Sequence, residues 1–140
     1  MGCSKEPQPI NYGSDACHFC KMNIVDPQHA AEIVTKKGKV FKYDAIECML
    51  NDTKNDQNTI ALYLVMDYNQ PDNFINATTA SYLISKAIPS PMNAYLSAFK
   101  TDDEAIEAKQ KHTGSVYTWD GIKLQKFNLE SANSVTENGF

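Results

Sequence analysis

The residues best suited to chemistry stand in the short stretch Cys17-His18-Phe19-Cys20-Lys21-Met22. A C-x-x-C pair occurs in zinc sites, in thioredoxin-like redox proteins and in disulfides, but none of these uses a methionine two residues later. In an extended segment, alternate side chains point to the same face, so Cys20 and Met22 would present two sulfur atoms together while Lys21 points away. Thiolate and thioether sulfurs are soft ligands that suit Cu(I). The residue types therefore favour a Cu(I) site that includes Cys20 and Met22.

Other interpretations of the C-x-x-C pair remain open. A thioredoxin-like pair would begin a helix whose N-terminus lowers the pKa of the first thiol, and the β-branched residues and Pro27 that follow disfavour a helix here. A closed zinc site needs four ligands, which Cys17, His18, Cys20 and Cys48 could supply, although no spacing requires it. Cys17 and Cys20 could also form a disulfide in an oxidising compartment.

The remaining soft and imidazole side chains are better explained by structure than by chemistry. Cys48 and Met49 occupy adjacent positions of an expected helix, and both are predicted to pack in the core. His29 is expected in a turn. His112 is expected near a helix C-terminus, where a cation is favourable.

The composition excludes several classes of function. The chain has 140 residues and is 42% hydrophobic, which is enough for one globular domain that folds without a metal. The net charge is −4 with both signs mixed along the chain, which argues against nucleic-acid binding. All 13 basic residues are lysines, which weakens any site built on bidentate recognition of phosphate or carboxylate. No acid–base or nucleophilic constellation is evident, so we expect a binding protein and not an enzyme.

The N-terminus predicts attachment to a membrane. Gly2-Cys3-Ser4 is typical of a bacterial lipoprotein after its signal sequence has been removed, with Cys3 as the lipidated residue. The pattern for eukaryotic myristoylation fails because position 6 is Glu. Residues 1–14 are then expected to form a flexible tether between the lipid and the domain.

From residue 30 onward the pattern predicts two similar halves, each in the order strand, strand, helix, strand. The first half (15–72) has expected strands at 30–35, 39–43 and 60–66, and a helix over 46–50 that Asp44 would cap. The second half (73–124) has expected strands at 81–85, 94–99 and 115–119, and a helix from 101 or 102 to 112 that Gly114 would end. Residues 125–140 are polar and are expected to form a disordered tail. The sequence therefore predicts an α+β protein made of a duplicated ββαβ unit.

The same motifs carry a resemblance to a known family. The run Cys17 to Ile24, the segment Phe41-Lys42-Tyr43-Asp44, and Pro91-Met92-Asn93-Ala94 followed by Ala98-Phe99 resemble the NosL family over roughly residues 15–119. The family pattern is C-G-M near the N-terminus and P-M-G later, and Lys21 and Asn93 stand where the family usually has glycine. The resemblance implies a fold of two ββαβ units related to the organomercurial lyase MerB, which agrees with the duplication inferred above.

The resemblance also implies a set of metal ligands. It assigns Cys20 and Met22 as Cu(I) ligands and Met92 as a third sulfur from the other half. Cys17 and His18 have weaker support as members of the site.

The function that the resemblance implies is that of an envelope Cu(I) metallochaperone or assembly factor. Such a protein would be lipid-anchored through Cys3, would face the periplasm, and would deliver copper to apo-nitrous-oxide reductase together with its maturation machinery. Two alternatives stay open: a zinc-stabilised binding module, and a MerB-like thiol enzyme in which Cys17 would supply the second thiol.

Overall fold

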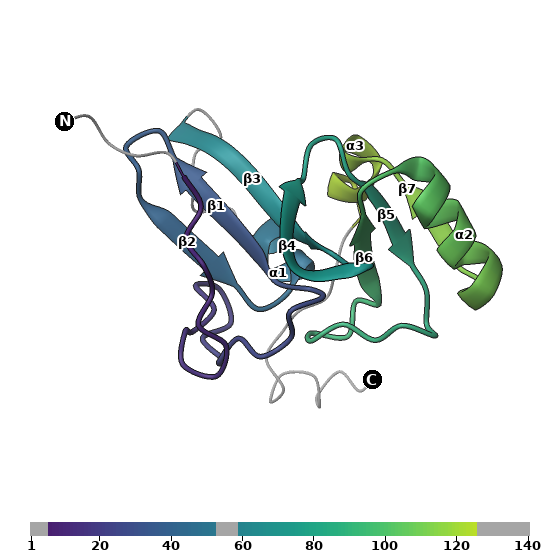
Figure 1. Ribbon diagram of the computed structural model, residues 1–140, viewed down its shortest axis with the longest axis horizontal. Helices are drawn as coiled ribbons and strands as arrows, with labels where there is room; N and C mark the ends of the chain where they lie inside the picture. The colour runs from purple at the N-terminus through teal and green to yellow at the C-terminus, as the bar shows by residue number, and fades with distance from the viewer. Residues whose placement is uncertain (1–5, 53–58, 126–140) are drawn as a thin grey trace.

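The computed structural model describes residues 6–52 and 59–125, and these form two antiparallel sheets that lie next to each other (Figure 1). The elements follow in the order β1 (Ala31–Thr35), β2 (Val40–Tyr43), α1 (Ile46–Asn51), β3 (Ile60–Asp67), β4 (Gln70–Asn76), β5 (Ser81–Ile84), β6 (Leu96–Phe99), α2 (Asp102–His112), β7 (Ser115–Tyr117) and α3 (Trp119–Lys123).

The first sheet has the strand order β2-β1-β3-β4. β1 is its most buried strand, because Ala31, Ile33 and Val34 are all at most 1% exposed. β1 pairs antiparallel with β2 through a turn at 36–39, and pairs antiparallel with β3 on its other side. The short helix α1 follows β2 directly, so residues at the end of this hairpin and at the start of α1 are held close together.

The second sheet has the strand order β6-β5-β7, and α2 packs against it. Thr101 caps α2, because its side-chain oxygen accepts a hydrogen bond from the backbone N–H of Glu104. The helix ends at His112, two residues before Gly114, as predicted. Gly114 has φ +117°, and a Cβ atom there would lie 2.2 Å from the carbonyl oxygen of Ile84, so only glycine fits.

The duplicated ββαβ unit and the α+β fold class are confirmed. In both sheets the first strand of the unit lies in the middle, between the second and the third (β2-β1-β3 and β6-β5-β7). Two elements were not predicted. β4 pairs with β3 and contains the expected boundary between residues 72 and 73, and the short helix α3 begins at Trp119, where the last strand was expected to end.

Two local expectations are wrong. Asp44 does not cap α1, because the N-cap residue is Ala45 and no side chain caps the helix; Asp44 is instead buried. The expected flexible tether is also shorter than residues 1–14. Ile10 is only 5% exposed, and the Gln8 backbone N–H donates to Glu32 Oε2 at 3.1 Å, so the chain lies on the first sheet from Gln8 onward. Cys3 lies outside the described residues, as does the expected tail at 125–140 apart from Gln125.

The two halves share one interface. The Tyr68 N–H donates to the Ala98 carbonyl at 2.8 Å, and a single hydrophobic cluster contains Met66 of β3 together with Tyr82 and Leu96 of the second sheet.

None of the helices in residues 6–52 and 59–125 has the length and the apolar composition of a membrane span.

Candidate metal centre

The C-x-x-C motif lies in a tight loop before β1. An isolated antiparallel bridge closes this loop, the Cys17 N–H donates to the Met22 carbonyl at 2.8 Å, and the Lys21 N–H donates to the Cys17 carbonyl at 3.0 Å. Lys21 has φ +70°, a left-handed conformation. The segment therefore turns back on itself, and the prediction that Cys20 and Met22 share one face of an extended strand is wrong.

A third cysteine meets this loop from α1. The Sγ atoms of Cys17, Cys20 and Cys48 all lie within 4.8 Å of one another, and all three thiols are free. Cys17 and Cys48 are buried, whereas Cys20 is half-buried. We call these three residues the thiol cluster. Because β2 leads into α1 beside the loop, Cys48 lies next to Cys17 and Cys20 although it is at least 28 positions away in the sequence.

The thiols have unequal proton affinities. A hydrogen bond with Cys48, helped by backbone N–H groups including that of Cys20, lowers the pKa of Cys17 to about 5 against the opposing effect of burial. Burial and then the negative charge of Cys17 raise the pKa of Cys20 to about 11. The hydrogen bond with Cys17, followed by burial, raises the pKa of Cys48. Cys17 is therefore the thiolate of the metal-free cluster, and a cation has to displace protons from the other two thiols.

A hollow lies beside Cys17 on the surface of the protein. It has a volume of about 300 Å³ and lies between the loop and β2, with Cys17, His18, Phe41 and Lys42 among its lining residues. Of the three thiols, Cys20 is the least buried, and the hollow borders the cluster at Cys17.

Glu47 fastens the second half of the protein to the helix that carries Cys48. Its side chain is fully buried, and Oε2 accepts hydrogen bonds from Ser90 Oγ at 2.6 Å, from the Met92 N–H at 3.2 Å and from the Ala94 N–H at 3.4 Å. Burial raises the pKa of Glu47. The loop that carries Met92 is therefore held against the helix turn next to the thiol cluster.

The two candidate methionines differ in exposure. Met22 is 60% exposed, whereas Met92 is partly buried and packs against the hydrophobic cluster that includes Cys17 and Cys48. Asn93 has φ +64°, so it is left-handed, as Lys21 is. Both positions at which the family pattern has glycine thus adopt the conformation that glycine favours. The roles of Met22 and Met92 as ligands stay predictions.

His18 lies next to the thiol cluster but outside it. Its ring centroid is 4.4 Å from that of Phe41, and its Nε2 is 3.8 Å from Asp52 Oδ2. Its membership of the metal site stays a prediction.

His29 belongs to a constellation that the sequence did not indicate. Its Nδ1 lies 2.8 Å from Asp26 Oδ2 and its Nε2 lies 3.0 Å from Ser97 Oγ. This is the order of a Ser-His-Asp triad, but a triad acts only where a substrate can reach the serine, and Ser97 is fully buried. His29 instead joins the two halves through a buried hydrogen bond.

Cys48 is a candidate ligand that the sequence analysis assigned to the core. It is indeed buried, but its thiol faces the other two cysteines. The sequence analysis considered Cys48 as a ligand only in the zinc interpretation. Its spacing from the C-x-x-C motif does not indicate that the two are in contact.

Comparison with known proteins identifies the family. A family model described as NosL matches residues 9–127. The chain belongs to the NosL family. The resemblance inferred from the motifs is therefore confirmed.

Two members of the NosL family illustrate the similarity. The chain is 28% identical over 143 residues to the copper-binding lipoprotein NosL of Stutzerimonas stutzeri, and the match covers 94% of this chain and 74% of that protein. The crystal structure of the copper chaperone NosL from Shewanella denitrificans matches with a TM-score of 0.70 at 23% identity, over 84% of this chain and 95% of that one. The second match shows that the two proteins share a fold.

Proposed function

We propose that this NosL-family chain is a Cu(I) metallochaperone of the bacterial cell envelope. The observation that carries the proposal is the thiol cluster, in which Cys17, Cys20 and Cys48 bring three soft sulfur ligands within 4.8 Å of one another. The copper-binding name of the relative from Stutzerimonas stutzeri supports the choice of metal.

The size of the thiol cluster suits one metal ion. A metal–sulfur bond of about 2.3 Å places the sulfurs of a planar three-coordinate site about 4 Å apart. The three Sγ atoms lie within 4.8 Å, so each has to move by less than about 1 Å to bind. A low-charge, soft cation tolerates such a three-sulfur shell without a fourth ligand.

Thioether sulfurs from the two methionines would make the site labile by exchanging with the thiols. Met22 is exposed beside Cys20, and the backbone of Met92 is fastened to Glu47 beside Cys48. In our proposal copper leaves through Cys20, Met22 and Met92, which are all less buried than Cys17 and Cys48. An incoming ligand can then replace them one at a time, which a closed four-ligand cage would prevent.

The proposal also includes a membrane anchor and a recipient for the copper. A lipid on Cys3 would hold the chain on a membrane with its domain in the periplasm, and the name of the relative as a lipoprotein supports this. The recipient in this proposal is apo-nitrous-oxide reductase with its maturation machinery. The chain would act as a carrier and would not catalyse a reaction.

Anaerobic titration of the reduced protein with Cu(I), in competition with a chromogenic Cu(I) chelator, tests the proposal. We expect one copper per chain, and X-ray absorption at the copper edge should report a first shell made of sulfur. A shell dominated by nitrogen or oxygen would refute the site. Transfer is tested separately by mixing the loaded chain with apo-nitrous-oxide reductase and measuring the copper that each retains.

A structural zinc site is the second candidate, because three thiols also suit Zn²⁺. The two candidates differ in what the metal does for folding. A structural zinc supplies folding energy, so a chelator would unfold the protein. A copper carrier has its own core and should unfold cooperatively in the metal-free form.

A further inference from the structure

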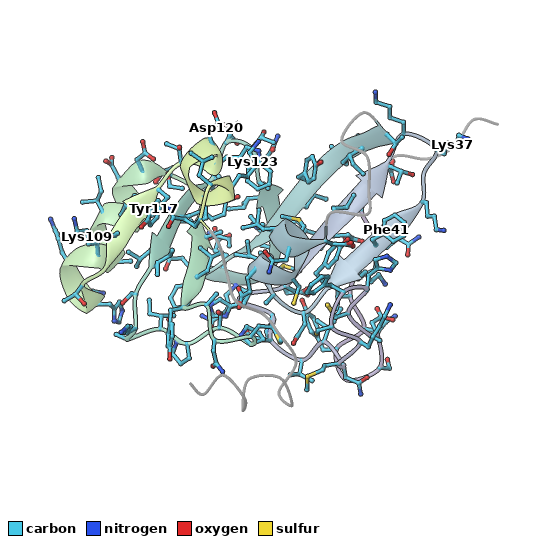
Figure 2. All side chains as sticks on the ribbon, turned by 180° about the vertical axis from the view of Figure 1, so that it is seen from behind. Lys37, Phe41, Lys109, Tyr117, Asp120 and Lys123 are labelled. Carbon is cyan, nitrogen blue, oxygen red and sulfur yellow. The ribbon has the colours of Figure 1, made fainter. Side chains whose placement is uncertain are left out.

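The turn between β1 and β2 carries three lysines at one tip of the molecule. Lys36, Lys37 and Lys39 are all exposed, and Figure 2 shows Lys37 projecting beyond the end of the sheet. Among residues 6–52 and 59–125, no ion pair involves any of them. We call these three residues the basic turn.

The basic turn has a fixed shape. The Gly38 N–H donates to the Thr35 carbonyl at 2.9 Å, the Thr35 N–H donates to the Lys39 carbonyl at 2.8 Å, and Thr35 Oγ1 accepts from the Lys39 N–H at 2.9 Å. Three positive charges that form no ion pair with a described residue are thus held close together, in a protein whose net charge is −4. Lys39 Nζ also lies 5.3 Å from the centre of the Phe41 ring.

The N-terminal segment lies along the same hairpin. The Gln8 N–H bonds to Glu32 Oε2, and Lys42 Nζ donates to the Pro9 carbonyl at 3.0 Å. Figure 1 shows the described part of this segment running from the end at which β1 finishes down to the loop that holds Cys17. The chain therefore enters the fold from the side of the basic turn.

The length of the chain between Cys3 and Gln8 limits how far from the fold a lipid on Cys3 can lie. Five residues separate Cys3 from Gln8, which span at most about 17 Å when fully extended. Glu32, which holds Gln8, lies three positions before Thr35 at the end of β1, a distance of about 10 Å along the strand, and the basic turn follows directly. The chain from Gln8 is therefore long enough for a lipid on Cys3 to lie level with the basic turn.

We propose that the basic turn is a membrane-facing surface that binds the anionic headgroups of the lipid bilayer in which the chain is anchored. The inference rests on the lipid anchor of the proposed function and is independent of copper. Each lysine close to an anionic surface strengthens the attraction by about fivefold. A lipid and a basic patch together give the two signals that fix a peripheral protein on a membrane.

This orientation directs the thiol cluster away from the bilayer. The pair Val34 and Val40 lies next to the basic turn, whereas the pair Ala31 and Tyr43 lies at the opposite end of the hairpin, about 10 Å away along the strand. The His18 N–H bonds to the Lys42 carbonyl at 2.8 Å, so the metal loop is attached at that opposite end. A soluble partner can then reach Cys20 and Met22 without approaching the membrane.

Amine footprinting of the full lipidated chain in vesicles tests the orientation. The rates at which an amine-acylating reagent labels each lysine are compared by mass spectrometry in phosphatidylcholine vesicles and in vesicles that contain phosphatidylglycerol. Lys86, Lys109 and Lys111 are the control set, because they are exposed lysines of the second half; Figure 2 places Lys109 at the opposite end of the molecule from Lys37.

We expect labelling of the basic turn to slow at least about fivefold in the anionic vesicles, and about 1 M salt should reverse the effect by screening. The control lysines should be labelled at the same rate in both vesicles. Equal labelling of the basic turn, or slower labelling of the control set in its place, would overturn the inference. Flotation distinguishes the two proposals: a chain that does not float with vesicles lacks the anchor, and the inference fails with it, whereas a floating chain with equally labelled lysines refutes the orientation alone.

Discussion

Replacing Cys48 by alanine tests the thiol cluster most directly, because Cys48 is the residue that only the structure places there. The substitution removes one of three sulfurs that lie within 4.8 Å of one another and leaves Cys17 and Cys20 in their loop. The loop itself is closed by backbone hydrogen bonds that do not involve Cys48, so its geometry should survive.

The expected loss of copper affinity can be estimated from the contribution of one ligand to the binding free energy. Structural metal sites with four ligands bind with about 10–16 kcal/mol, which is about 3 kcal/mol per ligand, or about a hundredfold in Kd. The cost to folding is smaller. Cys48 is fully buried, and removing one heavy atom from such a position costs about 1 kcal/mol.

The assay is anaerobic competition for Cu(I) against a chelator, with the sulfur coordination number measured at the copper edge. Met49→Ala is the matched control, because Met49 is the next residue of α1 and is 3% exposed. It should cost about 2–5 kcal/mol of folding stability and leave copper affinity unchanged in the folded protein. If Cys48→Ala retains both the affinity and the sulfur number of the wild type, Cys48 is a core residue and the three-thiol site is wrong.

Three further changes separate ligand, backbone and charge effects. Met92→Ala should weaken Cu(I) binding at least tenfold, about 1.4 kcal/mol, with little effect on folding stability. Met66→Ala, in the core, is the control and should cost about 2–5 kcal/mol of folding stability without changing copper affinity. If Met92→Ala destabilises the fold and leaves copper affinity unchanged, Met92 is not a ligand. Lys21→Gly should stabilise the protein by up to about 1 kcal/mol, because φ at this position is +70° and glycine adopts that conformation without strain. A denaturant titration measures the change. A loss of stability would show that the Lys21 side chain stabilises the fold by more than its backbone conformation costs. Burial raises the pKa of Glu32 from 4.5 to about 7, so the folded state prefers the protonated acid. This contribution to stability is fully present below pH 4.5, and about 3 kcal/mol is lost as pH rises through 7. Glu32→Gln should remove this part of the pH dependence; if the wild type and the variant show the same difference in stability between pH 5 and pH 8, the assignment to Glu32 is wrong.

The order of the elements could be predicted because each element has a local signal. A short run with β-branched residues marked β1, alternation marked β2, and Thr101 and Gly114 marked the two ends of α2. β4 has no such signal: Gln70 to Asn73 are exposed, and the strand forms because its backbone pairs with β3. The formation of an exposed, polar strand that contains a proline depends on pairing with a neighbouring strand, and a local sequence pattern does not predict that pairing.

The candidate site could be predicted in part. The C-x-x-C loop was found, but its shape was wrong, because the conformation of Lys21 is unfavourable for lysine and is imposed by the hydrogen bonds that close the loop. Cys48 was missed because an apolar-looking cysteine in a helix is usually core, and only the position of α1 beside the loop turns it into a partner of Cys17. The bond between His29 and Ser97 spans 68 positions, and nothing in either segment indicates it.

The exposure of the sulfurs suggests how one site can both hold and release a cation. Cys48 and Cys17 are buried, Cys20 is half-buried, and Met22 is 60% exposed. A buried thiolate is protected from competing ligands, whereas an exposed thioether can be replaced by a sulfur of the recipient. Removing the inner Cys48 should therefore lower affinity, while removing the outer Met22 should change mainly the rate of transfer. If both substitutions changed affinity alone, the gradient from buried to exposed sulfur would have no part in release.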